Sequence, residues 1–315
     1  MTRKLVSLTL LALFVSSFTA FAAPKDAPAA QKVDGKSLGP ISCVASSIEK
    51  YPDGTLKKCI ITEAKTAPGA NVTCSANQPL SLHPEGTLAQ CILAVDRSYP
   101  DPLGLTCDDG KIIAFYPDGS LAKCTLAVEK KATLLGVTCS TTTPMELYPD
   151  GMLKQCFTTV EKTVPASPTK EVHVSEITCA KNNIIGFNEK GRVNKCVPTE
   201  SVYMRGKGTC LPGEPISLQA DGKVQECTYT YPLYQNRSCK VESRVSFHEN
   251  GNFKDCTLPE DRTVGTVVCK GDAPISYRAN GNVASCTLAA QAEKAPGNVI
   301  KAGTVVEFDE QHKIR

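Results

Sequence analysis

Sixteen cysteines fall into eight pairs of nearly constant spacing, with none left over. Between the two members of each pair lies the same phrase: an apolar alternation, a turn ending in Gly, and another apolar residue. The gap within a pair is 15 or 16 residues, whereas the gap between pairs ranges from 11 to 22, and pairing across repeats would leave Cys43 and Cys286 alone. We therefore expect a tandem array with one disulfide per repeat. The expected pairs are Cys43-Cys59, Cys74-Cys91, Cys107-Cys124, Cys139-Cys156, Cys179-Cys196, Cys210-Cys227, Cys239-Cys256 and Cys269-Cys286.

The phrase between the cysteines predicts a β-hairpin. Counting from its Gly as position zero, positions −6 and +2 are apolar in every repeat and position −4 in seven of eight, which is a period of two, a turn, and an apolar residue again. In Tyr116-Pro117-Asp118-Gly119, Pro pre-sets φ and Gly takes φ > 0, as a three-residue loop with a G1 bulge requires. Such a loop pairs −4 with +2 on a buried face and turns −3 and +1 outward. The turn glycines are Gly54, Gly86, Gly119, Gly151, Gly191, Gly222, Gly251 and Gly281.

A short β-rich run before each first cysteine, such as Val137-Thr138-Cys139, adds one more strand, so each unit should hold about three. There is no Trp and only 6% of residues are aromatic, which favours thin cross-linked layers over a thick core. We expect an all-β, disulfide-stapled array of hairpins in an elongated, solenoid-like sheet, with a closed β-propeller as the alternative. A ninth, degenerate copy near the C-terminus has His312 in place of the turn Gly and should act as a cap.

The ends of the chain indicate export. Residues 1–22 read as a signal peptide, with Arg3 and Lys4 before an apolar run and a small-residue cleavage site at its end; an uncleaved anchor is the alternative. Residues 23–42 are expected to be a disordered lead-in, 43–160 to hold repeats 1–4, 161–174 to be a Pro-containing linker, and 175–315 to hold repeats 5–8 and the cap. Export places the thiols in an oxidising compartment, periplasmic or extracellular, where they form disulfides. Zinc is disfavoured because no two cysteines are closer than 12 positions.

The turn string resembles two repeat types. Phe247-His248-Glu249-Asn250-Gly251-Asn252-Phe253 is similar to variant MORN repeats, in which an aromatic residue, Asn-Gly or Asp-Gly and an apolar residue make serial hairpins. The same string also resembles the turn between inner strands of a WD-type propeller blade. The resemblance covers about nine residues per unit. A MORN-like relationship implies an elongated sheet for protein or lipid contact, and a propeller relationship implies a closed disc for binding.

The sequence offers little chemistry for catalysis. It contains no His-Glu-x-x-His, Gly-x-Ser-x-Gly or Gly-x-Gly-x-x-Gly motif, so we expect no enzyme, no cofactor and no metal. Acidic turn residues could form a calcium-binding ladder, although turn propensity explains them as well: Asp53, Glu85, Asp118, Asp150 and Asp221. The formal charge of +3 falls to about +1 without Arg3 and Lys4, which disfavours nucleic acid as a partner.

One row of side chains is a candidate binding surface. Position −3 carries rings in the first four repeats and mostly polar groups in the last four. The ring-bearing residues are Tyr51, His83, Tyr116 and Tyr148. Outward aromatic rows can stack sugars or peptides. The expected function is an exported, non-enzymatic interaction or structural module of the envelope or extracellular space. The alternative is a carbohydrate-binding or carbohydrate-active protein that uses this row; the partner, protein or glycan, is unknown, and no integral membrane segment is expected after signal cleavage.

Overall fold

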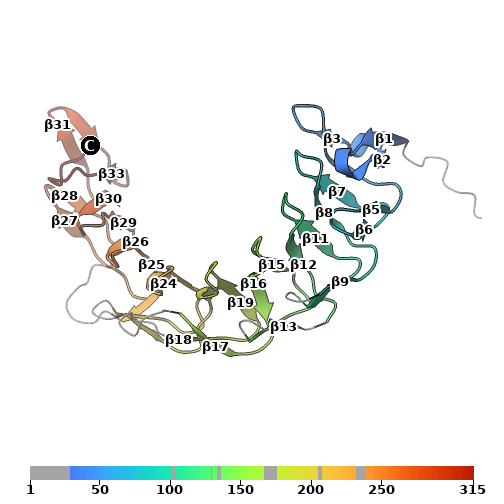
Figure 1. Ribbon diagram of the computed structural model, residues 1–315. Helices are drawn as coiled ribbons and strands as arrows, with labels where there is room; N and C mark the ends of the chain where they lie inside the picture. Colours follow the sequence, from blue (N-terminus) through green and yellow to red (C-terminus); the bar gives the residue numbers. More distant parts are fainter. Residues whose placement is uncertain are drawn as a thin grey trace, which may run out of the picture.

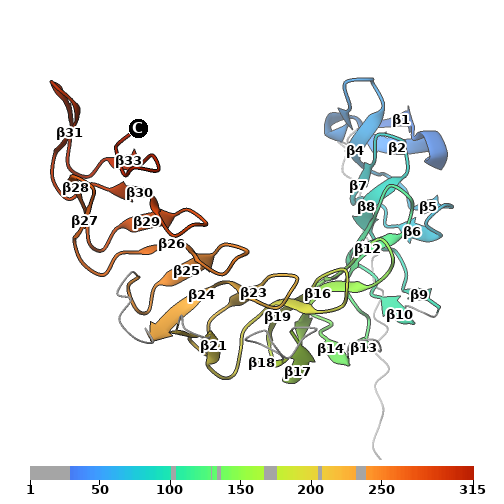
Figure 2. The same cartoon turned by 60° about the vertical axis from the view of Figure 1, so that its left-hand side comes forward.

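The computed structural model is an open arc built around one long antiparallel sheet (Figure 1). It describes residues 29–100, 104–128, 130–132, 136–166, 176–204, 208–231 and 239–315. The sheet begins at β3, which pairs with β4, and ends at β33, which pairs with β30. The two ends of the arc lie apart in both Figure 1 and Figure 2. The sheet is not closed, so the expected solenoid-like sheet is confirmed and the alternative, a closed propeller, is wrong.

Each repeat contributes one two-stranded hairpin, here called the main hairpin, to this sheet. The first strands are β3 (Glu49–Lys50), β7 (Pro79–Leu82), β11 (Ile112–Phe115), β15 (Met145–Leu147), β19 (Asn183–Phe187), β23 (Ile216–Leu218), β25 (Arg244–Phe247), β29 (Pro274–Tyr277) and, in the cap, β33 (Val305–Glu307). The second strands are β4 (Leu56–Ile60), β8 (Leu88–Ile92), β12 (Leu121–Cys124), β16 (Leu153–Thr158), β20 (Val193–Cys196), β24 (Val224–Tyr231), β26 (Phe253–Thr257) and β30 (Val283–Thr287). Every second strand also pairs with the first strand of the next repeat, which makes the sheet continuous.

The turn has the predicted form. In repeat 3, Tyr116 N donates to Ser120 O and Gly119 N donates to Tyr116 O, which encloses a three-residue loop. Gly119 has φ of 86°, the left-handed conformation that only Gly adopts at little cost. The register then pairs Phe115 at −4 with Leu121 at +2, and both side chains are buried. In the cap, His312 takes the same conformation with φ of 58°.

A second irregularity follows the turn and was not predicted. The register of every main hairpin in repeats 1–8 shifts between −5 and −4, so that −5 lies opposite +4 and position +3 is an extra residue. Without this β-bulge, strict alternation would turn the cysteine at +5 away from the face that holds +2. With it, Cys124 pairs with Ile113 at −6 and is fully buried. The bulge therefore brings the second cysteine of each repeat into the core.

Eight disulfides connect the two cysteines of each repeat. The Cα–Cα distances are 5.7 or 5.8 Å throughout, within the usual range for a disulfide. They are the pairs expected from the spacing: Cys43–Cys59, Cys74–Cys91, Cys107–Cys124, Cys139–Cys156, Cys179–Cys196, Cys210–Cys227, Cys239–Cys256 and Cys269–Cys286. Disulfide sulfur atoms thus run through a core otherwise made mainly of Leu, Ile, Val and Phe.

The expected count of three strands per repeat is one too few. In the described part of the chain, a further short strand follows every main hairpin except that of repeat 6, after which residues 232–238 lie outside the described range. This strand pairs with the strand that leads into the next repeat, forming a side hairpin. The side hairpins are β5 (Lys65–Ala67) with β6 (Val72–Cys74), β9 (Arg97–Tyr99) with β10 (Leu105–Cys107), β13 (Lys130–Ala132) with β14 (Val137–Cys139), β17 (Lys162–Pro165) with β18 (Glu176–Cys179), β21 (Val202–Met204) with β22 (Gly208–Cys210), β27 (Arg262–Val264) with β28 (Val267–Cys269), and β31 (Ala292–Ala295) with β32 (Asn298–Ile300). These strands are only three or four residues long, too short to stand out as an alternating pattern. Figures 1 and 2 show the side hairpins on the outer rim of the arc and the turns of the main hairpins on its inner rim.

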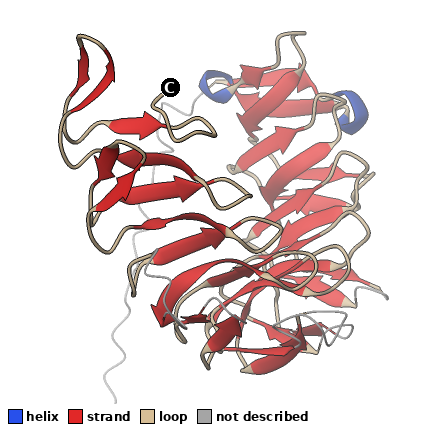
Figure 3. Cartoon of the chain, turned by 90° about the vertical axis from the view of Figure 1, so that its left-hand side faces the viewer, coloured by secondary structure: helices blue, strands red, loops and turns tan. Residues whose placement is uncertain are grey.

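Two segment boundaries differ from expectation. Part of the predicted disordered lead-in is ordered: β1 (Ala30–Asp34) pairs with β2 (Pro40–Val44), and Ile41 is buried. Two short 3₁₀ turns, Lys36–Leu38 and Ala45–Ser47, lie at this end (Figure 3). The start of the predicted linker is also ordered, because β17 forms a side hairpin like those of the other repeats. The predicted signal peptide lies outside the described residues.

Within the described part of the chain, no helix has the length and apolar character needed to cross a membrane. The eight intramolecular disulfides point to a non-cytoplasmic, secreted protein.

Candidate functional site

The inner rim of the arc holds the predicted −3 row, and there each side chain reaches the next repeat. Tyr116 Oη donates to Leu147 O at 2.8 Å, and Leu147 is the −4 residue of the following repeat. The same contact recurs along the array: Tyr51 to Leu82 O at 2.9 Å, His83 Nε2 with Phe115 O at 3.0 Å, Tyr148 to Phe187 O at 2.8 Å, His248 Nε2 with Tyr277 O at 2.8 Å, and Arg278 to Phe308 O. Gln219 donates instead to His248 O at 3.1 Å. These side chains form a ladder between repeats.

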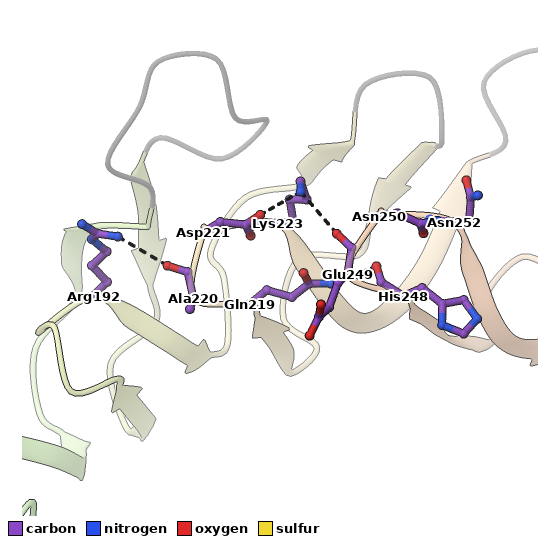
Figure 4. A network of polar contacts seen from close by, with 9 residues as sticks. All are labelled: Arg192, Gln219, Ala220, Asp221, Lys223, His248, Glu249, Asn250 and Asn252. Atoms are coloured by element: carbon purple, nitrogen blue, oxygen red, sulfur yellow. Dashed lines mark hydrogen bonds and ion pairs between the residues drawn. The ribbon is translucent and has the colours of Figure 1, made fainter. Parts of the chain in front are cut away.

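A second set of contacts runs beside the first, from +1 side chains to the −2 carbonyl of the next turn. Figure 4 shows part of it in repeats 5 to 7. Arg192 donates to Ala220 O at 3.4 Å, and Lys223 Nζ donates to Glu249 O at 3.2 Å while it pairs with its own Asp221 at 2.8 Å. These groups are exposed, so each contact contributes little stability by itself.

The −3 row is therefore not the free outward row that the sequence predicts. Its rings are half-buried and, in all four ring-bearing repeats, the polar atom binds the next repeat. Burial raises the pKa of Tyr148. The ladder is missing at one junction: Asn188 turns its Oδ1 back to accept Lys190 N and Arg192 N, and its Nδ2 is buried without a partner.

The acidic turn residues serve their own turns. Asp118 Oδ1 accepts the backbone N and the hydroxyl of Ser120, at 2.9 and 2.7 Å. The Ser120 hydroxyl and backbone donors lower the pKa of the Asp118 carboxyl, and Thr55 does the same for Asp53. Asp150 and Asp221 make the same bond to the backbone N at +1. This is the local bonding for which turns select Asp, in agreement with the turn-propensity explanation.

Three carboxylates elsewhere lie close enough to share a cation. Asp96, Asp108 and Asp109 each place one oxygen within 4.8 Å of the others, near the side hairpin between repeats 2 and 3. Asp96 Oδ1 already accepts Asp109 N at 2.9 Å. Oxygen ligands suit calcium, but this group lies apart from the acidic ladder considered in the sequence.

The solvent-facing side of the main sheet, here called the open face, carries positions −5, +3 and +4 of every repeat. Positions −5 and +4 form one continuous row, because each pairs with the other both within a hairpin and between hairpins. The row runs Glu49, Lys58, Ser81, Gln90, Ala114, Lys123, Glu146, Gln155, Gly186, Lys195, Ser217, Glu226, Ser246, Asp255, Ser276, Ser285, Glu307. The row is polar and mixed in charge. Ion pairs along it include Lys123 with Glu146 at 3.3 Å.

A second row on the open face differs between the two halves of the arc. In repeats 1 to 5 it is mainly apolar, with Thr125 of repeat 3 as a polar interruption. We call its apolar members the apolar strip: Ile60, Pro79, Ile92, Ile112, Phe157 and Ile184. In repeats 6 to 8 the corresponding pairs place threonines beside Arg244, Pro274 and Val305. Alternation within the strands could have revealed this row in the sequence, but the unpredicted bulge hides which face it occupies.

Comparison with known proteins adds no assignment, because no family model matches the chain and no curated protein matches its sequence. The resemblance to MORN repeats or to propeller turns thus stays a resemblance of the turn. What the geometry offers is two rims and one long open face, on a framework held by a disulfide in each repeat.

Proposed function

We propose that the protein is an exported, non-enzymatic interaction module of the envelope or extracellular space, which contacts a protein partner through its open face. The framework supports a scaffold role, since each repeat carries its own disulfide and the rim side chains connect it to the next. Such quasi-one-dimensional arrays present long binding surfaces.

The apolar strip is the observation on which this proposal depends. Ile60, Ile112 and Ile184 are 38%, 37% and 45% exposed, although they lie in regular strands of the disulfide-bonded main sheet. Contiguous exposed apolar side chains mark contact sites on soluble proteins. In the last three repeats the same row carries threonines beside Arg244, Pro274 and Val305, and it has no isoleucine. A partner that uses the isoleucines should therefore contact the first five repeats.

Site-specific photocrosslinking tests this proposal. A photoreactive phenylalanine at position 112 or 184 should give discrete crosslinked products in cells that export the protein, and the same probe at position 257, on the same row of repeat 7, should not. Ile60→Asp should weaken the products at 112 without changing the melting temperature. The same crosslinked products from the probe at all three positions, or no products from the probe at 112 and at 184, would contradict the proposal.

The second candidate function is glycan binding through the −3 row. Four ring-bearing residues from successive repeats do lie along one rim, which supports it, but their polar atoms are engaged with the next repeat. If the row binds a glycan, Tyr116 and Tyr148 should do so through their ring faces. Changing both to Phe should then preserve binding, while changing both to Ser should weaken it.

A further inference from the structure

A groove crosses the open face of repeats 6 and 7. It consists of two adjoining hollows of about 460 and 590 Å³, which share Gln225, Phe247 and Lys254. The first lies over β24, β25 and β26, and the second continues toward the turns, where it reaches His248. The groove thus runs from the sheet to the inner rim.

The register of the strands explains the groove. Ser246 on β25 lies opposite Glu226 on one side and Asp255 on the other. These two carboxylate-bearing residues are two strand spacings apart, about 9–10 Å between backbones. The small Ser246 side chain between the longer Glu226 and Asp255 leaves a hollow with Ser246 at its base, here called the floor. The bulge residues Gln225 and Lys254 extend its two sides toward the turn.

The surface of the groove is polar. Val245 and Phe247 are only 1% and 5% exposed and belong to the core. Glu226 and Asp255 accept hydrogen bonds, Arg244 and Lys254 donate them, and Gln225 and Ser246 do both. Donors and acceptors are thus interleaved over a shallow floor. An apolar ligand would offer these groups no hydrogen bond in place of the water it displaces, whereas a hydroxyl-rich one would bind both kinds.

The charged side chains that line the groove restrict the class of ligand further. In the first hollow, Glu226 and Asp255 are balanced by Arg244 and Lys254. The second hollow adds the carboxylates of Asp221 and Glu249, so nothing in the groove attracts a polyanion. Arg244 Nε donates to Glu226 Oε1, and Ser246 Oγ donates to Asp255 Oδ2 at 2.8 Å, which holds both carboxylates in place. The bond from Arg244 lowers the pKa of Glu226, the opposite of what a general acid in glycoside cleavage needs.

We propose that the groove over β25 binds a neutral oligosaccharide, held by hydrogen bonds to Glu226, Asp255 and Arg244. This goes beyond the proposed function, since it assigns a second ligand to the other half of the open face and uses neither the apolar strip nor the −3 row. The same face also carries hydroxyl groups in repeat 8, where Ser276 Oγ and Ser285 Oγ share a hydrogen bond at 2.6 Å. A longer chain would find further partners there.

The test uses the exported, disulfide-bonded protein on an array of neutral and amino-sugar oligosaccharides, followed by calorimetric titration with the strongest binder and with hexalysine. Glu226→Gln combined with Asp255→Asn should weaken binding at least about tenfold, as loss of charge-assisted hydrogen bonds does. Ser246→Tyr, which fills the floor without changing charge, should abolish it. The matched control is Lys123→Gln with Glu146→Gln on the open face of repeats 3 and 4, which should bind as the parent does.

The outcomes separate the explanations. No signal on the array, or equal affinity of the groove variants and the control, would overturn the proposal. Binding of hexalysine but of no oligosaccharide would overturn it in favour of a basic peptide. Ile60→Asp should leave oligosaccharide binding unchanged, so failure of the apolar strip and failure of the groove are distinguished. Near-parent circular dichroism and melting of each variant exclude unfolding as the cause.

Discussion

At the residue scale, replacing the turn glycine should destabilise the protein through strain in the backbone and not through a steric clash. The nearest atom to a Cβ at Gly119 would be Gly69 O at 4.0 Å, so the position is open in space, yet its φ is +86°. We expect Gly119→Val to lower the free energy of unfolding by roughly 1–2 kcal/mol, since a β-branched residue resists φ > 0. Gly69→Val is the control, because that glycine is also uncrowded but has no left-handed φ. Equal losses in urea titrations of the two variants would contradict this explanation.

The −3 ladder leads to a second prediction for a single residue. Tyr116→Phe removes one hydroxyl and leaves Leu147 O without its side-chain donor. The free energy of unfolding should fall by about 0.5–1.5 kcal/mol, the usual net value of one intramolecular hydrogen bond. Tyr203→Phe serves as the control, since Tyr203 is 51% exposed on a side hairpin. Unchanged stability of Tyr116→Phe in thermal unfolding would mean that the ladder contributes nothing measurable.

At the scale of the element, the spacing between the turn and the second cysteine should decide whether the disulfide forms. Deleting Ala122, the +3 residue of repeat 3, removes the bulge and leaves Cys124 two positions after Leu121, so strict alternation keeps Cys124 on the buried face and the disulfide should form. Deleting Ala122 and Lys123 together places Cys124 directly after Leu121 and turns it to the open face, away from Cys107. For this double deletion we expect two free thiols in a thiol titration and a loss of about 3 kcal/mol by the chain-entropy model. Ala122→Lys keeps the bulge and resembles Lys57, Lys154 and Lys254 in other repeats, so it should retain the disulfide. Free thiols in the single deletion, or a fully oxidised double deletion, would refute the role of alternation and bulge.

The elements also show what the sequence could and could not reveal. The main hairpin was predictable because Pro, Asp and Gly fix its loop and the apolar positions fix its register, as Phe115 opposite Leu121 shows. The bulge was not, although a signal existed: +2 and +5 are both buried, and an odd separation between two inward residues requires an extra one. The candidate row failed for a related reason. Alternation within a strand predicts that a side chain points outward, but it does not predict whether the next repeat covers that side chain. In the structure Tyr116 donates a hydrogen bond to Leu147 O of the next repeat.

At the scale of the whole molecule, the open arc joins repeats through pairs of neighbouring strands and rim contacts, so most interactions are local. β12 of repeat 3 pairs with β11 in its own repeat and with β15 in the next. One junction is weaker on the inner rim, where Asn188 bonds to its own turn instead of to repeat 6. Stability should therefore vary along the array as a sum of repeat and interface contributions.

Local coupling leads to the last prediction. Replacing Cys107 and Cys124 by Ser removes the disulfide of repeat 3 and should destabilise that repeat by about 3 kcal/mol, because the cross-link closes a loop of this size. In hydrogen exchange, amides of β11 and β12 should exchange faster, whereas those of β29 and β30, five repeats away, should keep their parent rates. Replacing Cys269 and Cys286 by Ser is the reciprocal control and should produce the reverse pattern. Uniform acceleration across the chain in either variant would mean that the arc unfolds as one cooperative unit.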